Sequence, residues 1–176
     1  MSILAVYRQD QLQEPMRVLT HAEDIARDLA RVGVLWWQFP LSQPLADDEA
    51  LRRQFAPQVE QLMLEQGYRH AEIVNKPPLP AYLEAEEVVA ESWHSHPQEG
   101  LRLFLRGGGV LSLLVGDEVL SIGCQPGDAL KVPADIVHSF RGRPGEDCML
   151  VCLMPGMDGV QRQDYTGLKG FKPLDI

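Results

Sequence analysis

The chain has 176 residues, a hydrophobic content of 45% and a formal net charge of −9 at pH 7. This size and composition suit one globular domain with a buried core. Without a basic stripe to displace phosphate counterions, the chain is not expected to bind nucleic acid. No apolar run approaches the roughly 20 residues that span a bilayer, so no membrane contact is expected either. Small molecules are the expected partners.

The start of the chain, MSILAVYRQDQLQEP, lacks the basic segment and apolar core of a signal peptide, so we expect a cytoplasmic protein. Three cysteines, Cys124, Cys148 and Cys152, are too few and too oddly placed for a disulfide framework and are expected to be buried thiols. No residue pattern indicates an oligomeric state.

Two helices are predicted in the first half of the chain. Thr20 and Glu23 have the spacing of a capping box, and the apolar residues that follow recur at helical intervals. A second helix is expected over residues 46–66, with Gly67 as its stop and Pro57 as a kink or break.

From residue 68 onward short β-prone runs replace the helical spacing, separated by Gly, Pro and Asp. Gly116 and Asp117 form a strong two-residue hairpin signal. Hairpins without intervening helices favour a mainly β sandwich or barrel. The expected strands are 88–89, 101–105, 110–115, 118–122, 129–132, 139–141 and 149–153.

The stretch WHSHPQEGLR carries His94 and His96 at positions i and i+2, which places both imidazoles on one face of a strand. His138 follows about forty residues later, after a turn, a strand and a second turn. Three histidines in this pattern predict a metal site, and neutral imidazoles suit first-row transition metals.

These segments resemble the two cupin motifs: His-x-His, three or four residues, Glu, six residues, Gly; then Gly, five residues, Pro-x-Gly, two residues, His. Gly107 stands at the end of the first motif, and Gly127, Pro133 and His138 match the second. Asp135 stands where the second motif usually has glycine. Among cupins the chain is most similar to the acireductone dioxygenases, and the likeness runs from the first helix to a terminal YTG.

The resemblance implies a cupin double-stranded β-helix, a jelly-roll barrel with two or three N-terminal helices. We expect one cupin domain over residues 1–176, with a helical part at 1–80 packed on the barrel, a barrel core at 81–155 and an irregular tail at 156–176. It implies metal binding by His94, His96 and His138, together with a glutamate at the position that Gly100 occupies.

Three interpretations of the missing glutamate remain open. The metal is held by the three histidines alone, as in the ferrous centre of cysteine dioxygenase. Alternatively, a β-bulge moves Glu99 into the ligand position as a fourth ligand, although strand alternation places it on the opposite face from Gly100. In the third interpretation, the chain is a cupin that has lost its metal.

The substrate shell is partly kept in the resemblance. Arg102 matches a family arginine and is expected as the catalytic residue that neutralises substrate charge, and Phe140 matches an aromatic two residues after the last histidine. Phe104 shares the face of Arg102 by strand alternation. Cys152 and Val160 stand where the family usually has arginine and tryptophan. We therefore expect Arg102, Phe104, Phe140 and Cys152 to contact the substrate.

The function implied is a metal-dependent dioxygenase, with Fe(II) as the expected metal and Ni(II) or another first-row ion as alternatives. The family cleaves the methionine-salvage enediol 1,2-dihydroxy-3-keto-5-methylthiopentene with O2. Because Gly100 replaces a ligand, we expect a diverged member that binds a small chelating substrate. The alternative from another class is a non-catalytic cupin that binds or senses a small molecule.

Overall fold

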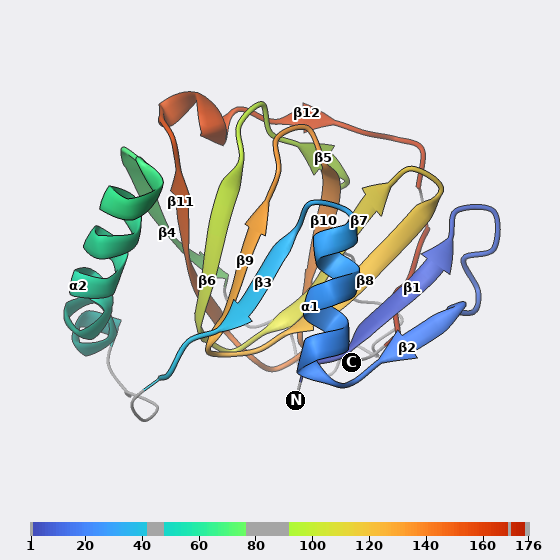
Figure 1. The fold of residues 1–176 in the computed structure, drawn as a ribbon, viewed down its shortest axis with the longest axis horizontal. Helices are drawn as coiled ribbons and strands as arrows, with labels where there is room; N and C mark the ends of the chain where they lie inside the picture. The colour runs from blue at the N-terminus through green and yellow to red at the C-terminus, as the bar shows by residue number, and fades with distance from the viewer. Residues whose placement is uncertain (1, 42–47, 77–91, 169, 175–176) are drawn as a thin grey trace.

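The computed structural model describes residues 2–41, 48–76, 92–168 and 170–174 as two antiparallel sheets flanked by two α-helices (Figure 1). One sheet has seven strands and the other has five, and the described strand pairings keep the two sheets separate. No helix in the described part of the chain is long and apolar enough to cross a membrane.

The seven-stranded sheet combines strands from the N-terminal, middle and C-terminal parts of the chain. The order across it is β12 (Gln163–Asp164), β5 (His94–Ser95), β10 (Val137–Gly142), β7 (Gly109–Val115), β8 (Glu118–Cys124), β1 (Leu4–Arg8) and β2 (Arg17–Leu19). The order across the five-stranded sheet is β3 (Leu35–Gln38), β9 (Asp128–Val132), β6 (Gly100–Arg106), β11 (Cys148–Met154) and β4 (His70–Lys76).

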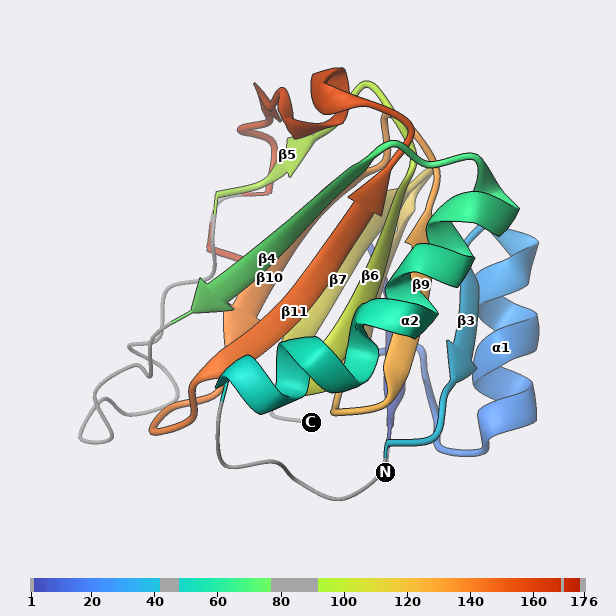
Figure 2. The ribbon, with the colours of Figure 1, turned by 90° about the vertical axis from the view of Figure 1, so that its left-hand side faces the viewer.

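The two helices cover different parts of the sheets. Helix α1 (Ala22–Arg31) lies beside β3, whereas α2 (Asp48–Gln66) crosses the outer face of the five-stranded sheet, as Figure 2 shows. Leu51 and Phe55 of α2 pack there against residues of β6 and β11. A second core fills the space between the sheets and includes Phe104, Leu111 and Phe140.

Most of the predicted β-structure is confirmed. Each strand expected between residues 101 and 153 is present within one to two residues of its predicted bounds, and Val115 pairs with Glu118 across a two-residue hairpin turn. The strand expected at 88–89 lies outside the described residues. All three cysteines are free thiols; Cys124 and Cys148 are buried and Cys152 is partly buried.

Residues 1–80, expected to be mainly helical, also contribute β1, β2, β3 and β4, and the tail after residue 155 contains a 3-10 helix (Met157–Val160) and β12. Of these strands, β1, β3, β4 and β12 each pair with a strand far away in the sequence, and β2 pairs with β1 at the edge of the sheet. Strand β4, for example, pairs with β11, more than 70 residues later. Short strands of this kind are stabilised by the sheet they join, which local pattern does not reveal.

Two details of the helices differ from prediction. The N-cap of helix α1 is His21, one residue after the expected Thr20, and it makes no side-chain capping hydrogen bond, so the prediction of a capping box at Thr20 was wrong. Helix α2 continues through Pro57 as one element. The predicted break is therefore absent. Apolar residues before and after Pro57 pack in one cluster with the sheet, and Gly67, with φ of 69°, follows the last helical residue as expected.

Candidate metal centre

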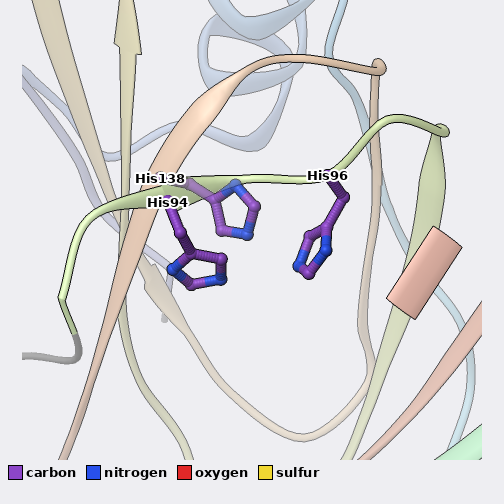
Figure 3. A group of neighbouring side chains, drawn as sticks. All are labelled: His94, His96 and His138. Carbon is purple, nitrogen blue, oxygen red and sulfur yellow. The ribbon is translucent and has the colours of Figure 1, made fainter. Parts of the chain in front are cut away.

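The side chains of His94, His96 and His138 point toward one another, as Figure 3 shows. His94 lies on β5, His96 follows directly after it, and His138 lies on β10, paired with His94 across the ladder. The ring centroids lie 4.4 Å apart for His94 and His138 and 5.1 Å apart for His94 and His96. Two segments that are distant in sequence thus build one cluster.

Each of these histidines hydrogen-bonds through Nδ1 to a backbone carbonyl. The acceptors are the oxygens of Ser92 for His94, of Gln161 for His96 and of Ile136 for His138, at 2.7, 2.6 and 2.8 Å. A carbonyl only accepts, so the proton must be on Nδ1 in each ring. Each Nε2 therefore carries a lone pair, which is the form that binds a metal ion.

Burial keeps the imidazoles neutral. His94 and His138 are 5% and 4% exposed. Removal from water lowers the pKa of His94 to about 4, and the charges of Arg162, His96 and Arg102 act in the same direction. Burial and the charge of Arg102 lower the pKa of His138 to about 2. Burial also lowers the pKa of His96. All three rings are neutral at pH 7 and ready to act as ligands.

The cluster fits one transition-metal ion. The ligand atoms of the three histidines lie within 4.8 Å of one another. Two nitrogens that bind the same ion at about 2.1 Å can be at most about 4.2 Å apart, so rotations that bring the rings closer by about half an ångström suffice. Neutral nitrogen ligands with fixed tautomers suit iron, nickel, copper or zinc.

Arg102 extends from β6 into this cluster. Its Nη2 donates a hydrogen bond to Nε2 of His138 at 2.8 Å. Arg102 therefore reaches the histidine cluster, as expected for a substrate-contacting residue. A metal ion and this Nη2 donor would use the same lone pair of His138, so metal binding would require Arg102 to release it.

Gly100, which stands where the family has glutamate, and the adjacent Glu99 have different surroundings. Gly100 begins β6 at the cavity wall and has no side chain to offer. Glu99, the predicted fourth ligand, also reaches the wall, but its Oε1 accepts a hydrogen bond from the Tyr68 hydroxyl at 2.9 Å and lies 3.3 Å from Lys131 Nζ. The group of potential ligands in the described residues comprises the three histidines without Glu99.

A cavity of about 210 Å³ opens beside the histidines between the two sheets. Phe104, Phe140 and Cys152 line it together with Arg102, so the structure brings all four expected substrate contacts to one place. Phe104 is fully buried, and its ring lies 6.0 Å from that of Phe140. Burial raises the pKa of the Cys152 thiol, which is therefore uncharged at neutral pH. The cavity has an apolar wall and a polar, histidine-rich end.

Two contributions to the site were missed from sequence. Strand β12, in the supposedly irregular tail, pairs with β5, and Gln161 just before it fixes His96 through its carbonyl. Strand β4 adds Glu72 and Lys76 to the cavity wall, and the Lys76 ammonium lies 5.4 Å from the centre of the Phe140 ring. Backbone carbonyls carry no sequence signal, and HAEIVNK in β4 lacks a strict alternation of polar and apolar residues, so local pattern indicated neither contribution.

Asp135 stands where the second cupin motif usually has glycine, and its backbone has the conformation that glycine favours. Its φ is 64°, in the left-handed region, and its amide donates to the His96 carbonyl at 2.8 Å. Glycine adopts this conformation without strain, and aspartate is among the few other residues that tolerate it. The turn that presents His138 thus keeps the backbone shape of the motif.

Two antiparallel sheets with a histidine cluster between them define a cupin with a candidate metal centre. The chain is 31% identical over 172 residues to the acireductone dioxygenase of Stutzerimonas stutzeri (strain A1501), covering 95% of this chain and 93% of that protein. It is 30% identical over 173 residues to acireductone dioxygenase 1 of Pectobacterium atrosepticum, covering 97% and 99%. The chain belongs to the acireductone dioxygenase family, whose members are metal-dependent dioxygenases.

A solved structure supports the fold independently. Acireductone dioxygenase from Bacillus anthracis, with a cadmium ion in its active centre, superposes with a TM-score of 0.72 at 15% identity, covering 93% of this chain and 98% of that one. No family model matches the sequence. The expected cupin fold and family are thus confirmed.

Proposed function

We propose that this protein is a mononuclear metal-dependent dioxygenase that binds a small chelating substrate, an enediol or a close analogue, and reacts it with O2. The observation that carries the proposal is the convergence of three neutral Nε2 lone pairs beside the Arg102 guanidinium at one end of a cavity. Fe(II) is the expected metal, with Ni(II) or another first-row ion as alternatives.

His94, His96 and His138 would hold the ion, with their tautomers fixed by the three carbonyl acceptors. A divalent metal bound there supplies Lewis acidity and access to redox chemistry with O2. Holding Nδ1–H in place prevents the rings from turning away, so the geometry needed for chelation exists before the substrate arrives.

Arg102 acts on the substrate. Its guanidinium stays charged at any working pH and presents several N–H donors, so it favours the deprotonated, anionic form of an enediol. Its Nη2 donates to His138 Nε2, and metal binding at that nitrogen would free this donor. Arg102 lines the cavity, where its donors would orient the substrate oxygens. Arg102 is the residue to which we assign the catalytic role.

Phe104 and Phe140 form part of the apolar wall of the cavity. Both are buried, at 0% and 7% exposure, and they restrict the reacting end of the substrate to a space with little water. Low water content strengthens the attraction between Arg102 and an anionic substrate. Cys152 stands in place of a family arginine, and Lys76, which lies against the Phe140 ring, is a cation on this part of the described wall.

The test uses protein without a histidine tag, loaded anaerobically with Fe(II). We expect one iron per chain and oxygen uptake on addition of a desthio acireductone, with a keto acid and formate as products. His138→Gln should lose both iron and turnover. His21→Gln, at the exposed start of α1, is the matched control and should keep both.

Stoichiometric iron without oxygen uptake would contradict the dioxygenase assignment for this substrate. If the acireductone analogue then raised the melting temperature without turnover, the protein would be a binding module, as the lost glutamate ligand at Gly100 would allow. Failure to bind any first-row ion would contradict the metal centre itself.

A further inference from the structure

The backbone at Gly100 has room for a side chain. A Cβ atom placed there would meet nothing closer than 3.9 Å, the nearest atoms being Arg102 Nη1 and the Leu153 carbonyl oxygen. By contrast, a Cβ at Gly159 on the same cavity would lie 2.7 Å from Met154 Sδ. Gly100 is not among the glycines with positive φ. Neither packing nor backbone conformation requires glycine here, so space is available beside the histidines.

Arg102 faces this space. One end of its guanidinium, Nη1, is the nearest side-chain atom to the vacant Cβ position, while Nη2 donates to His138 Nε2. The cation therefore lies between Gly100 and His138 Nε2, and a metal ion bound at that nitrogen would free Nη2 for another acceptor. Planar guanidinium groups bind carboxylates through two parallel hydrogen bonds, and one edge of this group is turned toward the vacancy.

The described side chains around the cluster leave a net positive charge once a divalent ion is bound. The histidines are neutral, Arg102 and Lys76 are cationic, and a divalent ion would add two positive charges. Two carboxylates reach the cavity wall: Glu99 is engaged by Tyr68 and Lys131, and Glu72, whose charge acts on His96, offsets only part of this positive charge. Cations in a buried site attract an anion because uncompensated charge away from water is costly.

We propose that the space beside Gly100 is a carboxylate-binding position, in which Arg102 holds a carboxylate from outside the chain where other family members have their own glutamate. The inference rests on the metal centre of the proposed function. Two sources share this chemistry: a free carboxylate ion such as formate, and a carboxylate carried by the substrate. In this chain, a carboxylate from the solution or from the substrate would take the place of the glutamate side chain that other family members supply.

The test is a formate titration of full-length protein loaded with Co(II), followed by the visible absorption of the cobalt, with the metal content measured first. We expect saturable spectral change with one formate per cobalt. Gly100→Glu supplies an internal carboxylate and should abolish the response. Arg102→Gln should weaken formate binding about tenfold or more, because a hydrogen bond to a charged group is lost. Arg53→Gln, exposed on α2, is the matched control and should leave binding unchanged.

Pyruvate distinguishes the two sources. If it competes with formate, the position accepts a carboxylate carried by the substrate, and if both bind together, the position takes a free ion. One cobalt per chain with no formate response, or an undiminished response in Arg102→Gln, would overturn the carboxylate position and leave the metal centre intact. Absence of bound cobalt would overturn both.

Discussion

The buried histidines predict a steep loss of stability in acid for the metal-free protein. The ordinary pKa of histidine is 6.5, whereas burial lowers the pKa of His94 to about 4 and that of His138 to about 2. Below pH 6.5 the unfolded chain binds protons that the folded chain excludes. The free energy of unfolding therefore falls as the pH falls, and this contribution is absent above about pH 6.5.

The size of this decrease in the free energy of unfolding follows from the pKa shifts. Each histidine that is protonated only in the unfolded state removes about 1.4 kcal/mol per pH unit. Between about pH 6.5 and 4.5, His94 and His138 together remove about 5 kcal/mol, which is comparable to the whole stability of many domains. Their exposures of 5% and 4% mean that solvent screening reduces this figure little.

Urea unfolding followed by tryptophan fluorescence, in the presence of a chelator and at a series of pH values, measures this dependence. The double variant His94→Gln/His138→Gln is the control and should show a shallower loss. Burial raises the pKa of Asp128, which favours the fold in acid, but this group is common to both proteins and cancels in the comparison. Equal slopes for the two proteins would refute the reasoning.

Two further predictions concern the scaffold. Phe104→Ala removes a fully buried ring between the sheets and should lower the free energy of unfolding by about 3 kcal/mol, seen as a melting temperature lower by about 6–12 °C. The control Leu64→Ala changes a side chain that is 85% exposed and should alter the melting temperature little. Equal losses in the two variants would contradict the assigned core. Asp135→Gly should raise the stability by up to about 1 kcal/mol in urea unfolding, because Asp135 has φ of 64°, and a loss would show that its side chain stabilises the turn.

The fixed tautomers have a consequence for the centre as a whole. Three carbonyl acceptors come from three separate segments, around Ser92, Ile136 and Gln161. Each preorganises one ring, so ring orientation does not depend on the carboxylate that Gly100 lacks. The orientation of the three rings is therefore set by backbone acceptors and not by a carboxylate at position 100.

Much of the site could be predicted from the sequence because it depends on local spacing. Alternation of His94 and His96 put both rings on one face, the same alternation put Arg102 and Phe104 on the cavity face, and hairpin residues defined the strands around them. The likeness of the segment ending at His138 to a cupin motif indicated the fold. These features are set by residues close together in the chain.

Other features were decided only by tertiary structure. The pairing of β4 with β11 brings Glu72 and Lys76 to the cavity, and β12 places the Gln161 carbonyl against His96. The hydrogen bonds of Glu99 to Tyr68 and of Arg102 to His138 likewise join residues more than 30 positions apart. Local pattern determines which way a side chain points along a strand, but its partners depend on which distant segments the sheets bring beside it, because side-chain contacts are made across strands as well as along them.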